Sequence, residues 1–367
     1  MPSPEKKDAT MTDSLDIYAT PQQLVQLADV AKCSPGPLSP IPAMKKSIAR
    51  KSKKSLPKEW LQKKDQLKPE IAAMVQGISA ATSFTFLEFL TKKKTYHTSV
   101  YYSGTTMDSG FSLTDTGDQV RIQKPAVMEA AVDLISLHTG ESLLNRLGWD
   151  MELDIDDALI LLAIIDGARR KTLNALLGSA PDLLISLKDI QQSLKTKKGG
   201  RQWLSGTLGD SLGLKIPGRE KAQESLKRLE NKKLITRKGK KWQPGEMAGT
   251  LVSELLLLDS HINLRSVTTL ENNELGMTEI HVASGFANAH LLWSRGEETV
   301  KMVGLSSMEL LAMLYDMIRP GIKKMPDRGS EVEKQGPEEK RRPSFCRQCG
   351  AELAPDDKFC TKCGQAR

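Results

Sequence analysis

The sequence has few aromatic residues and no long apolar run. Phe, Trp and Tyr make up 5% of its 367 residues, which is low for a protein dominated by β-sheet. The longest apolar stretch, residues 158–165, is far shorter than the roughly 20 residues that cross a membrane, so we expect no transmembrane helix. Residues 1–13 are charged, contain proline and lack an apolar core, so we expect no secretory signal. The composition therefore predicts a soluble, cytoplasmic protein.

Local motifs of common enzymes are also missing. The sequence contains no Gly-x-Ser-x-Gly or His-Glu-x-x-His and no recognisable pair of catalytic carboxylates. Residues 206–213 are rich in glycine but lack the Gly-Lys-Ser/Thr ending of a phosphate loop, which favours a turn between helices. Because sites assembled from distant residues leave no local signature, these absences favour a non-enzymatic protein and leave an enzyme open.

The charge balance bears on the partners of the chain. Its formal net charge is +8, with 39% apolar and 27% charged residues. This composition can bury at least one full core, and the length predicts two to three domains. A moderate basic excess indicates an affinity for acidic partners and says little about the fold.

Four of the five cysteines form one pattern, Cys346-x2-Cys349-x10-Cys360-x2-Cys363. Two thiolates at x2 spacing hold a metal ion from one tight turn, and two such pairs complete the tetrahedral sulfur shell that structural Zn²⁺ prefers. Phenylalanine precedes and glycine follows each pair. The spacing predicts one bound zinc ion, with disulfides or a redox Cys-x-x-Cys as alternatives.

Residues 344–367 resemble the zinc-ribbon family, in particular the short ribbons at the termini of prokaryotic proteins. The resemblance implies that Cys346, Cys349, Cys360 and Cys363 are the zinc ligands. Four cysteine ligands close the shell and leave no position for catalysis. A segment this small cannot bury a core, so metal binding would supply its folding energy. Cys33 is expected to be an ordinary thiol in a loose N-terminal region.

Composition shifts divide the chain into six regions. The N-terminal part has proline at positions 35, 37, 40 and 42 and a basic run over residues 45–68. Both features predict little regular structure there. The exception is a predicted helix over residues 17–31 with Thr20 as its cap. The predicted regions are a largely disordered segment at 1–55, a first α+β lobe at 56–148, a helical, winged-helix-like segment at 149–245, a second lobe at 246–320, a linker at 321–343 and the ribbon at 344–367.

The two lobes show the same order of predicted elements, a helix, a β-meander and a helix. In the first lobe helical spacing runs through residues 67–90, strands are expected at 96–102, 110–115 and 119–123, and a helix at 125–137. In the second lobe helices are expected at 247–258 and 306–318, with strands at 261–269, 279–283, 289–293 and 299–303. In both lobes a valine is followed eight residues later by Met-Glu, at Val120 and Val300. We predict an α+β fold with an internal duplication.

The segment between the lobes is basic. A helix over residues 222–231 and strands over 234–237 and 238–243 resemble the third helix and wing of winged-helix proteins. That resemblance implies a helix in the major groove of DNA and a wing along the phosphates. The implied phosphate contacts are Lys227, Lys232, Lys238, Lys240 and Lys241. The alternative is the same fold used as a protein-contact or scaffold unit, with its charges solvated.

Acidic residues precede that segment, at Asp150, Glu152, Asp154, Asp156 and Asp157. They lack the spacing of an EF-hand calcium loop. Negative charge at the start of a helix is favoured by the positive end of the helix dipole. We therefore interpret Asp156 and Asp157 as the first turn of a helix.

Residues 226–267, a basic helix-turn, an apolar helix and then strands, are similar in layout to part of the EspG-type chaperones of type VII secretion. Those chaperones lack a ribbon, and the resemblance would imply that the chain holds a helical client. The sequence thus carries three hypotheses. The first is a non-enzymatic zinc-binding adaptor for a macromolecular, preferably protein, partner. The second is a DNA-binding transcriptional regulator, and the third is a secretion chaperone.

Overall fold

The computed structural model describes residues 15–47, 55–63, 66–106, 109–124, 128–140, 146–176, 178, 182–195, 202–211, 213–270, 274–319, 344–345 and 352–353. Contacts divide the chain into two units, Met1–Lys323 and Lys324–Arg367. Helices and antiparallel sheets are both abundant, so the chain is an α+β protein, as predicted. No helix among the described residues is long and apolar enough to cross a membrane.

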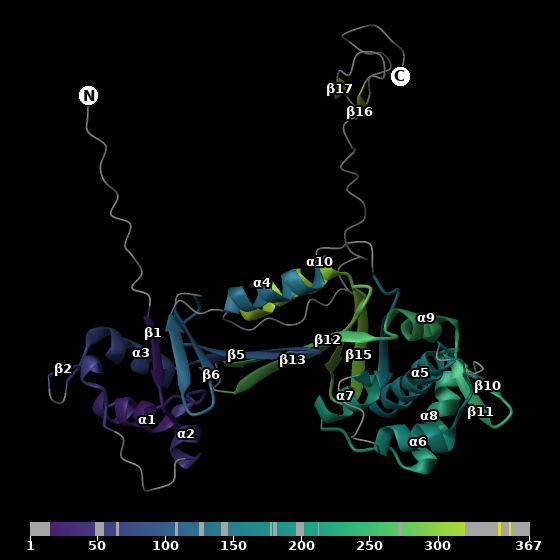
Figure 1. Ribbon diagram of the computed structural model, residues 1–367, viewed down its shortest axis with the longest axis horizontal. Coiled ribbons are helices and arrows are strands. Elements are labelled where there is room, and N and C mark those ends of the chain that lie inside the picture. The colour runs from purple at the N-terminus through teal and green to yellow at the C-terminus, as the bar shows by residue number, and fades with distance from the viewer. Residues whose placement is uncertain are drawn as a thin grey trace. The chain divides into compact units, whose positions relative to one another are not determined.

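A ten-stranded antiparallel sheet forms the centre of the first unit (Figure 1). Its strands, in spatial order, are β1 (Leu15–Ala19), β7 (Val120–Lys124), β6 (Gly110–Asp115), β5 (Thr95–Tyr102), β4 (Ser83–Thr91), β12 (Leu258–Thr269), β13 (Leu275–Gly285), β14 (His290–Arg295), β15 (Thr299–Leu305) and β8 (Asp150–Asp154). Two four-stranded meanders meet at β4 and β12, whose pairing runs from Ser83 opposite Thr268 to Thr91 opposite Ser260. The two predicted meanders therefore form one continuous sheet.

The helices complete two copies of one arrangement. The first copy contains α1 (Pro21–Val30), α2 (Ile41–Ser47), η1 (Lys58–Trp60), α3 (Pro69–Ser79) and α4 (Met128–Thr139), with a small hairpin of β2 (Leu61–Lys63) and β3 (Gln66–Leu67). The second contains α5 (Ile155–Leu176), α6 (Leu187–Lys195), α7 (Leu204–Ser211), α8 (Arg219–Asn231), α9 (Glu246–Glu254) and α10 (Ser307–Ile318). Each copy places an edge strand and helices before its meander and one helix after it. Both copies thus contain the predicted helix, meander and helix, and each adds an edge strand, β1 or β8.

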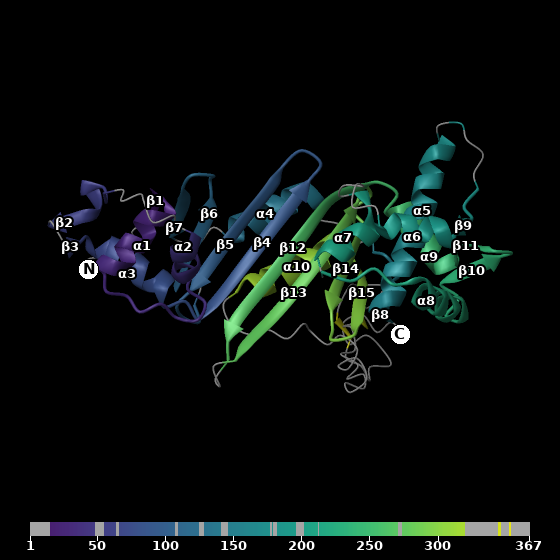
Figure 2. The same ribbon diagram turned by 90° about the horizontal axis from the view of Figure 1, so that it is seen from below.

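The helices cover the two faces of the sheet differently (Figures 1 and 2). Helices α4 and α10 lie over one face, where the Tyr102 hydroxyl donates a 2.9 Å hydrogen bond to the carbonyl of Ile318. On the other face α3 packs on β6 so closely that a Cβ at Gly77 would overlap the Phe111 ring. Farther along this face, Trp293 of β14 belongs to the same buried cluster as Leu161 of α5. The second face is thus covered at its ends by separate helical groups.

Part of the N-terminal region is ordered, which corrects the prediction of a largely disordered segment at residues 1–55. Strand β1 pairs with β7, and α1 begins with a capping box in which the Thr20 side chain accepts from the amide of Gln23. Leu24 and Leu27 are buried in the N-terminal core cluster, and Cys33 packs half-buried against it. The prolines that suggested disorder lie between α1 and α2 or inside α2. Residues 1–14 and 48–54 lie outside the described residues.

The continuous helical spacing predicted for residues 67–90 is wrong in its second half. Helix α3 ends at Ser79, and β4 begins at Ser83. Phe86, Leu87 and Leu90 therefore belong to a strand. Phe and Thr favour a strand when cross-strand neighbours cover them, and β4 has neighbours on both sides, β5 and β12. A glycine-rich turn was also expected at residues 206–213, but Gly206 and Gly209 lie within α7.

The insert between the two copies has its own small sheet. Strand β10 (Ile235–Lys238) pairs with β11 (Lys241–Pro244), and β11 pairs with β9 (Ile185–Ser186). The predicted helix at residues 222–231 is observed as α8, followed by the predicted strand. Leu226, Leu229 and Ile235 are buried in the cluster that also contains the apolar side of α5. Helix α5 is thus the scaffold on which the insert packs.

Candidate metal centre and interaction surfaces

The second unit contains a short strand pair, β16 (Ser344–Phe345) and β17 (Glu352–Leu353), with Phe345 opposite Glu352. Residues 346–351 connect the two strands, and this connection contains Cys346 and Cys349. All four predicted ligands, Cys346, Cys349, Cys360 and Cys363, lie outside the described residues. The donor set fits zinc, because four thiolates in two x2 pairs supply the number and type of ligands that a tetrahedral site requires.

The structure places the five predicted phosphate contacts in two different situations. Lys227, Lys238 and Lys240 are exposed. Lys232 Nζ lies 4.0 Å from the Asp157 carboxylate, and Lys241 Nζ lies 3.6 Å from the Asp182 carboxylate. The lysines therefore share the surface of the insert, and two of them already face acidic groups of the same chain.

Helix α8 is attached to the start of α5 by a buried carboxylate. Asp157 is fully buried, and Arg228 donates to it from Nη2 at 2.7 Å and from Nε at 3.0 Å. This hydrogen bond raises the pKa of Arg228. The prediction that Asp156 and Asp157 lie in the first turn of a helix is confirmed. The sequence did not indicate Arg228 as the partner, because the two residues are far apart in the chain.

The acidic cluster does not form a cation site in the part of the chain that the structure describes. There, no group of three or more His, Cys, Asp or Glu side chains is arranged to hold a metal ion. Instead, Asp154 and Asp157 contact Arg228, and Asp156 lies 3.6 Å from Lys221. These carboxylates hold α8 in place.

A second buried ion pair fixes the beginning of α7. Arg169 donates to Asp166 at 2.7 Å, and both side chains are at most 1% exposed. Asp166 also accepts from the backbone amides of Leu204 and Ser205 at 3.0 and 2.8 Å, and Arg169 donates to the Gln202 carbonyl. Burial lowers the pKa of Arg169, although the Asp166 charge opposes this. Every strong partner of the pair is a structural group, so we assign it to folding.

Two buried histidines also have structural partners. His290 lies between the hydroxyls of Ser284 and Ser307, at 2.8 and 3.0 Å, and His281 Nδ1 lies 2.7 Å from Asn263 Oδ1. Burial lowers the pKa of each histidine to about 4. Both rings are therefore neutral near pH 7. His290 is thus held through both ring nitrogens, whereas His281 is held through Nδ1, and its buried Nε2 has no hydrogen-bond partner among the described residues.

The uncovered part of the second sheet face carries a line of apolar side chains, which we call the apolar row. Its members are Tyr101, Phe84, Val267 and Met277, which stand opposite one another on β5, β4, β12 and β13. Residues directly opposite in a sheet project from the same face. The rings of Phe84 and Tyr101 are 4.8 Å apart, and Met277 is 64% exposed. Tyr101, Phe84 and Val267 are half-buried, and Tyr101 packs against the N-terminal core cluster. The four strands that carry the row lie at the middle of the sheet (Figure 2), so the row is a partly exposed apolar surface there.

Mostly polar side chains, with Phe86 among them, border the apolar row on one side. The next positions along the strands are Ser99, Phe86, Arg265 and Glu279, followed by His97, Glu88, Asn263 and His281. Arg265 Nε donates to Glu279 at 3.0 Å, and the Asn263 amide donates to Glu88 at 2.7 Å. The face therefore changes from apolar to hydrogen-bonding over a few residues. Sequence patterns did not reveal it, because the order and register of the strands were unknown.

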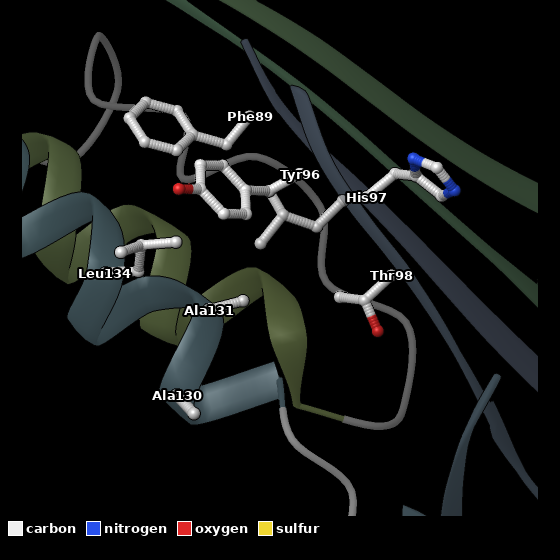
Figure 3. A pocket seen from close by; sticks show the side chains of 8 residues that line it. Phe89, Tyr96, His97, Thr98, Ala130, Ala131 and Leu134 are labelled. Carbon is white, nitrogen blue, oxygen red and sulfur yellow. The ribbon is translucent and has the colours of Figure 1, made fainter. Parts of the chain in front are cut away.

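The opposite face contains a small pocket of about 220 Å³ between α4 and the β4–β5 hairpin. Phe89 and Tyr96 form one wall with stacked rings 6.2 Å apart, and Ala131 and Leu134 of α4 form the other (Figure 3). His97 points away from the pocket in this view. The pocket contains mostly apolar groups.

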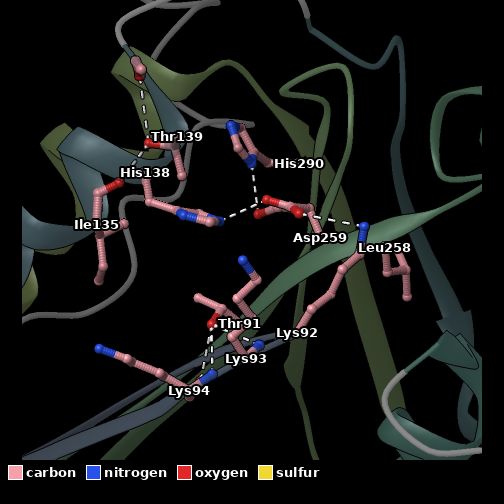
Figure 4. Close-up of polar contacts among 12 residues, drawn as sticks. Thr91, Lys92, Lys93, Lys94, Ile135, His138, Thr139, Leu258, Asp259 and His290 are labelled. Carbon is pink, nitrogen blue, oxygen red and sulfur yellow. Dashed lines mark hydrogen bonds and ion pairs between the residues drawn. The ribbon is translucent and has the colours of Figure 1, made fainter.

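A polar contact near this pocket ties α4 to the sheet. His138 Nε2 lies 2.6 Å from the Asp259 carboxylate, and Lys92 Nζ lies 3.6 Å from the same carboxylate (Figure 4). The edge of the His138 ring contacts Phe89. Asp259 thus joins α4, β12 and the turn after β4.

Comparison with known proteins identifies the C-terminal segment. Residues 345–366 match the zinc-ribbon domain. This match confirms the assignment made from the cysteine spacing, and it indicates that the chain binds zinc. The presence of the domain is compatible with a non-enzymatic adaptor. No curated protein sequence matches the chain.

Among solved structures, the chain is similar to the Mycobacterium tuberculosis type VII secretion system chaperone EspG5, determined in complex with the PE25–PPE41 dimer. The similarity covers 85% of this chain and 99% of that chain, with 9% sequence identity and a TM-score of 0.42.

Proposed function

We propose that this chain is a non-enzymatic adaptor that binds a partner protein on the uncovered face of its central sheet. The observation that carries the proposal is the apolar row, Tyr101, Phe84, Val267 and Met277. Contiguous exposed apolar surface is unfavourable in water and marks interaction sites when polar residues surround it. The polar border supplies the hydrogen-bonding rim that protein interfaces use for specificity.

The composition of the face favours a protein over a small ligand. Its apolar side chains come from four adjacent strands, and they form an extended surface rather than an enclosed cavity. Leu275, near one end of β13, is 53% exposed and extends the apolar surface. Methionine adapts its shape to different partners. The partner would therefore present apolar side chains flanked by hydrogen-bonding groups. The helical client implied by the EspG-type layout stays a hypothesis for its identity.

Placing a charge in the apolar row should disrupt partner binding. We expect a Met277→Glu variant of the full chain to recover at least about tenfold less of one specific protein, because a carboxylate buried without a partner opposes association. Affinity purification from the native source followed by quantitative mass spectrometry measures the recovery. The matched control is Leu137→Glu, because Leu137 is 85% exposed on α4.

The comparison between these variants decides the proposal. Support requires a protein whose recovery depends on Met277 and not on Leu137. Equal recovery of every captured protein with both variants contradicts it. Loss of self-association in Met277→Glu, measured by light scattering of the purified chain, would assign the face to a second copy and also contradict the partner hypothesis.

We further propose that the second unit binds one structural zinc ion through Cys346, Cys349, Cys360 and Cys363. The paired strands β16 and β17, which enclose the first cysteine pair in sequence, support this proposal. Zinc thiolates require reduced cysteines, which the cytoplasm provides. The ribbon, residues 344–367, would act as a second recognition module, joined by a linker over residues 321–343.

DNA binding by the insert is a second candidate, favoured by the exposure of Lys227, Lys238 and Lys240. The order α5, β9, α6, α7, α8, β10, β11, with β9 paired to β11, is similar to that of a winged helix with one added helix, α7, and also supports it. The exposed surface of α8, however, also carries Glu220 and Glu224. Carboxylates there would repel phosphates, so we rank this candidate below the adaptor.

A salt titration tests the DNA candidate. If the insert binds duplex DNA, affinity should fall steeply between about 50 and 200 mM salt, because bound lysines release counterions. A Lys238→Glu/Lys240→Glu variant should then bind at least about tenfold more weakly and show a shallower salt slope. Fluorescence anisotropy measures both quantities. Affinity weaker than micromolar at low salt, or an unchanged double variant, rejects DNA binding through these residues.

A further inference from the structure

Strand β1 is the first strand of the ten-stranded sheet and pairs with β7 on one side. Among the described residues, no strand pairs with its other edge. The sequence of β1, Leu-Asp-Ile-Tyr-Ala, alternates apolar and polar residues and contains no proline. A sheet edge of this kind is a template for another extended chain unless something protects it.

The pairing pattern shows which backbone groups of β1 face outward. In the preceding hairpin the Thr116 amide donates to the Gln119 carbonyl at 2.9 Å. Hydrogen-bonded and non-hydrogen-bonded pairs alternate along antiparallel strands. Counting from that bond, the backbone amides and carbonyls of Val120, Ile122 and Lys124 point toward β1. These residues pair with Ala19, Ile17 and Leu15. The amides and carbonyls of Asp16 and Tyr18 therefore point away from β7.

A groove of about 450 Å³ runs beside this edge. It lies between β1 and the residues of η1 and the start of α3. Leu15, Ile17, Trp60 and Ile71 contribute apolar surface, and Glu59 and Glu70 are exposed at the groove. Trp60 and Ile71 are buried in the N-terminal core cluster, so this wall of the groove is firmly packed.

We infer that this groove binds an extended, basic peptide segment of a partner protein, which adds to β1 as an eleventh strand. The Asp16 and Tyr18 backbone groups would supply the main-chain hydrogen bonds, as in other cases of strand addition. Leu15 and Ile17 would contact alternate apolar side chains of the peptide.

Glu59 and Glu70 favour lysine or arginine in the peptide. Asp16 contributes less to this preference, since Arg121 already donates to its carboxylate at 2.9 and 2.6 Å. Opposite charges that meet at an interface favour association and select among partners. The charge of the groove thus distinguishes basic from acidic peptides.

This site is separate from the apolar row. Strands β7 and β6 lie between β1 and the first strand of the row, β5. A failure of peptide binding at β1 would therefore leave the adaptor proposal intact, and the Met277→Glu variant should bind the peptide normally.

Fluorescence anisotropy with a defined probe tests the inference. The probe is a fluorescein-labelled nonapeptide of alternating lysine and valine, measured with the full chain in low salt. We expect saturable binding, and at least about tenfold weaker binding of the same peptide N-methylated on alternate residues facing β1, because its main-chain donors are lost. Binding of both peptides with equal affinity, or of neither up to millimolar concentration, would overturn the inference.

Protein variants locate the site. A Glu59→Gln/Glu70→Gln variant should bind the lysine–valine peptide about fivefold more weakly at low salt and to a similar extent as the parent at high salt. Glu220→Gln, an exposed site on α8, is the matched control and should change nothing. An unchanged double variant contradicts the inference. Peptide binding that appears only after residues 1–14 are deleted would indicate that this chain's own N-terminus occupies the groove. That result would also overturn the inference.

Discussion

A Cys360→Ser variant is expected to lose nearly all of the zinc that the full chain carries, whereas the parent protein should hold about one equivalent. Removing one thiolate opens a shell that requires four ligands. Because residues 344–367 are too few to bury a core, we expect the metal–sulfur bonds to provide the folding free energy of this segment, on the order of 10–16 kcal/mol in small zinc domains. The ribbon should therefore unfold with the loss of its metal.

Elemental analysis of the purified chain measures the zinc, and limited proteolysis measures the order of the ribbon. Addition of a chelator should make residues 344–367 sensitive to protease while the core of the first unit stays intact. The control is Cys33→Ser, because Cys33 packs against the N-terminal core cluster and belongs to the other unit. Zinc below about half an equivalent in the parent, or thiols that titrate equally with and without chelator, would reject the site.

Acidification is expected to destabilise the first unit between about pH 6.5 and pH 4. His281 and His290 have pKa values near 4 in the folded protein, mainly because burial disfavours the charged ring. At His281 the nearby Glu279 opposes this shift, while Arg265 and His261 add to it. In the unfolded chain a histidine titrates near pH 6.5, so the unfolded state binds protons first. The stability that depends on these neutral rings is complete above about pH 6.5 and falls as the pH decreases.

The expected loss is large. Each histidine should lower the free energy of unfolding by about 2 kcal/mol at pH 5 relative to pH 8, and the two together by about 4 kcal/mol. Urea denaturation followed by circular dichroism at a series of pH values measures it. The test compares how the free energy of unfolding changes with pH, not its absolute value. A variant that is less stable at every pH therefore still tests the prediction.

Single substitutions show which histidines cause the change of the free energy of unfolding with pH. His290→Gln removes one titrating ring and should reduce the loss between pH 7 and pH 5 by about half. His97→Gln, at an exposed position of β5, should leave the slope unchanged. A parent protein whose stability is constant between pH 7 and pH 5 would show that the two rings can be protonated without unfolding, contrary to the expectation.

The parts of this protein that could be predicted from sequence depend on residues close together in the chain. The helix start with Thr20 as its cap depends on a contact with Gln23, three residues along the chain. The hairpin of β6 and β7 is equally local. The repeated helix, meander and helix could be recognised because each element carries its own periodicity of apolar residues.

Long-range pairing was not predictable in the same way. Strand β1 was missed because its hydrogen-bonding partner β7 lies about a hundred residues away and its five residues carry little signal alone. Residues 83–90 were predicted to continue a helix because their apolar positions fit both periods. Pairing with the neighbouring strands β5 and β12 favours a strand over a helix for these residues.

The amino-acid sequence alone determined the zinc-binding segment, since its ligand types and spacing are complete within one short stretch of chain. The tertiary structure decided the rest. It joined the two meanders at β4 and β12, and this register placed Phe84 opposite Val267. The physical reason is that side chains in a sheet become neighbours through strand order and register, which the balance of packing over the whole unit selects.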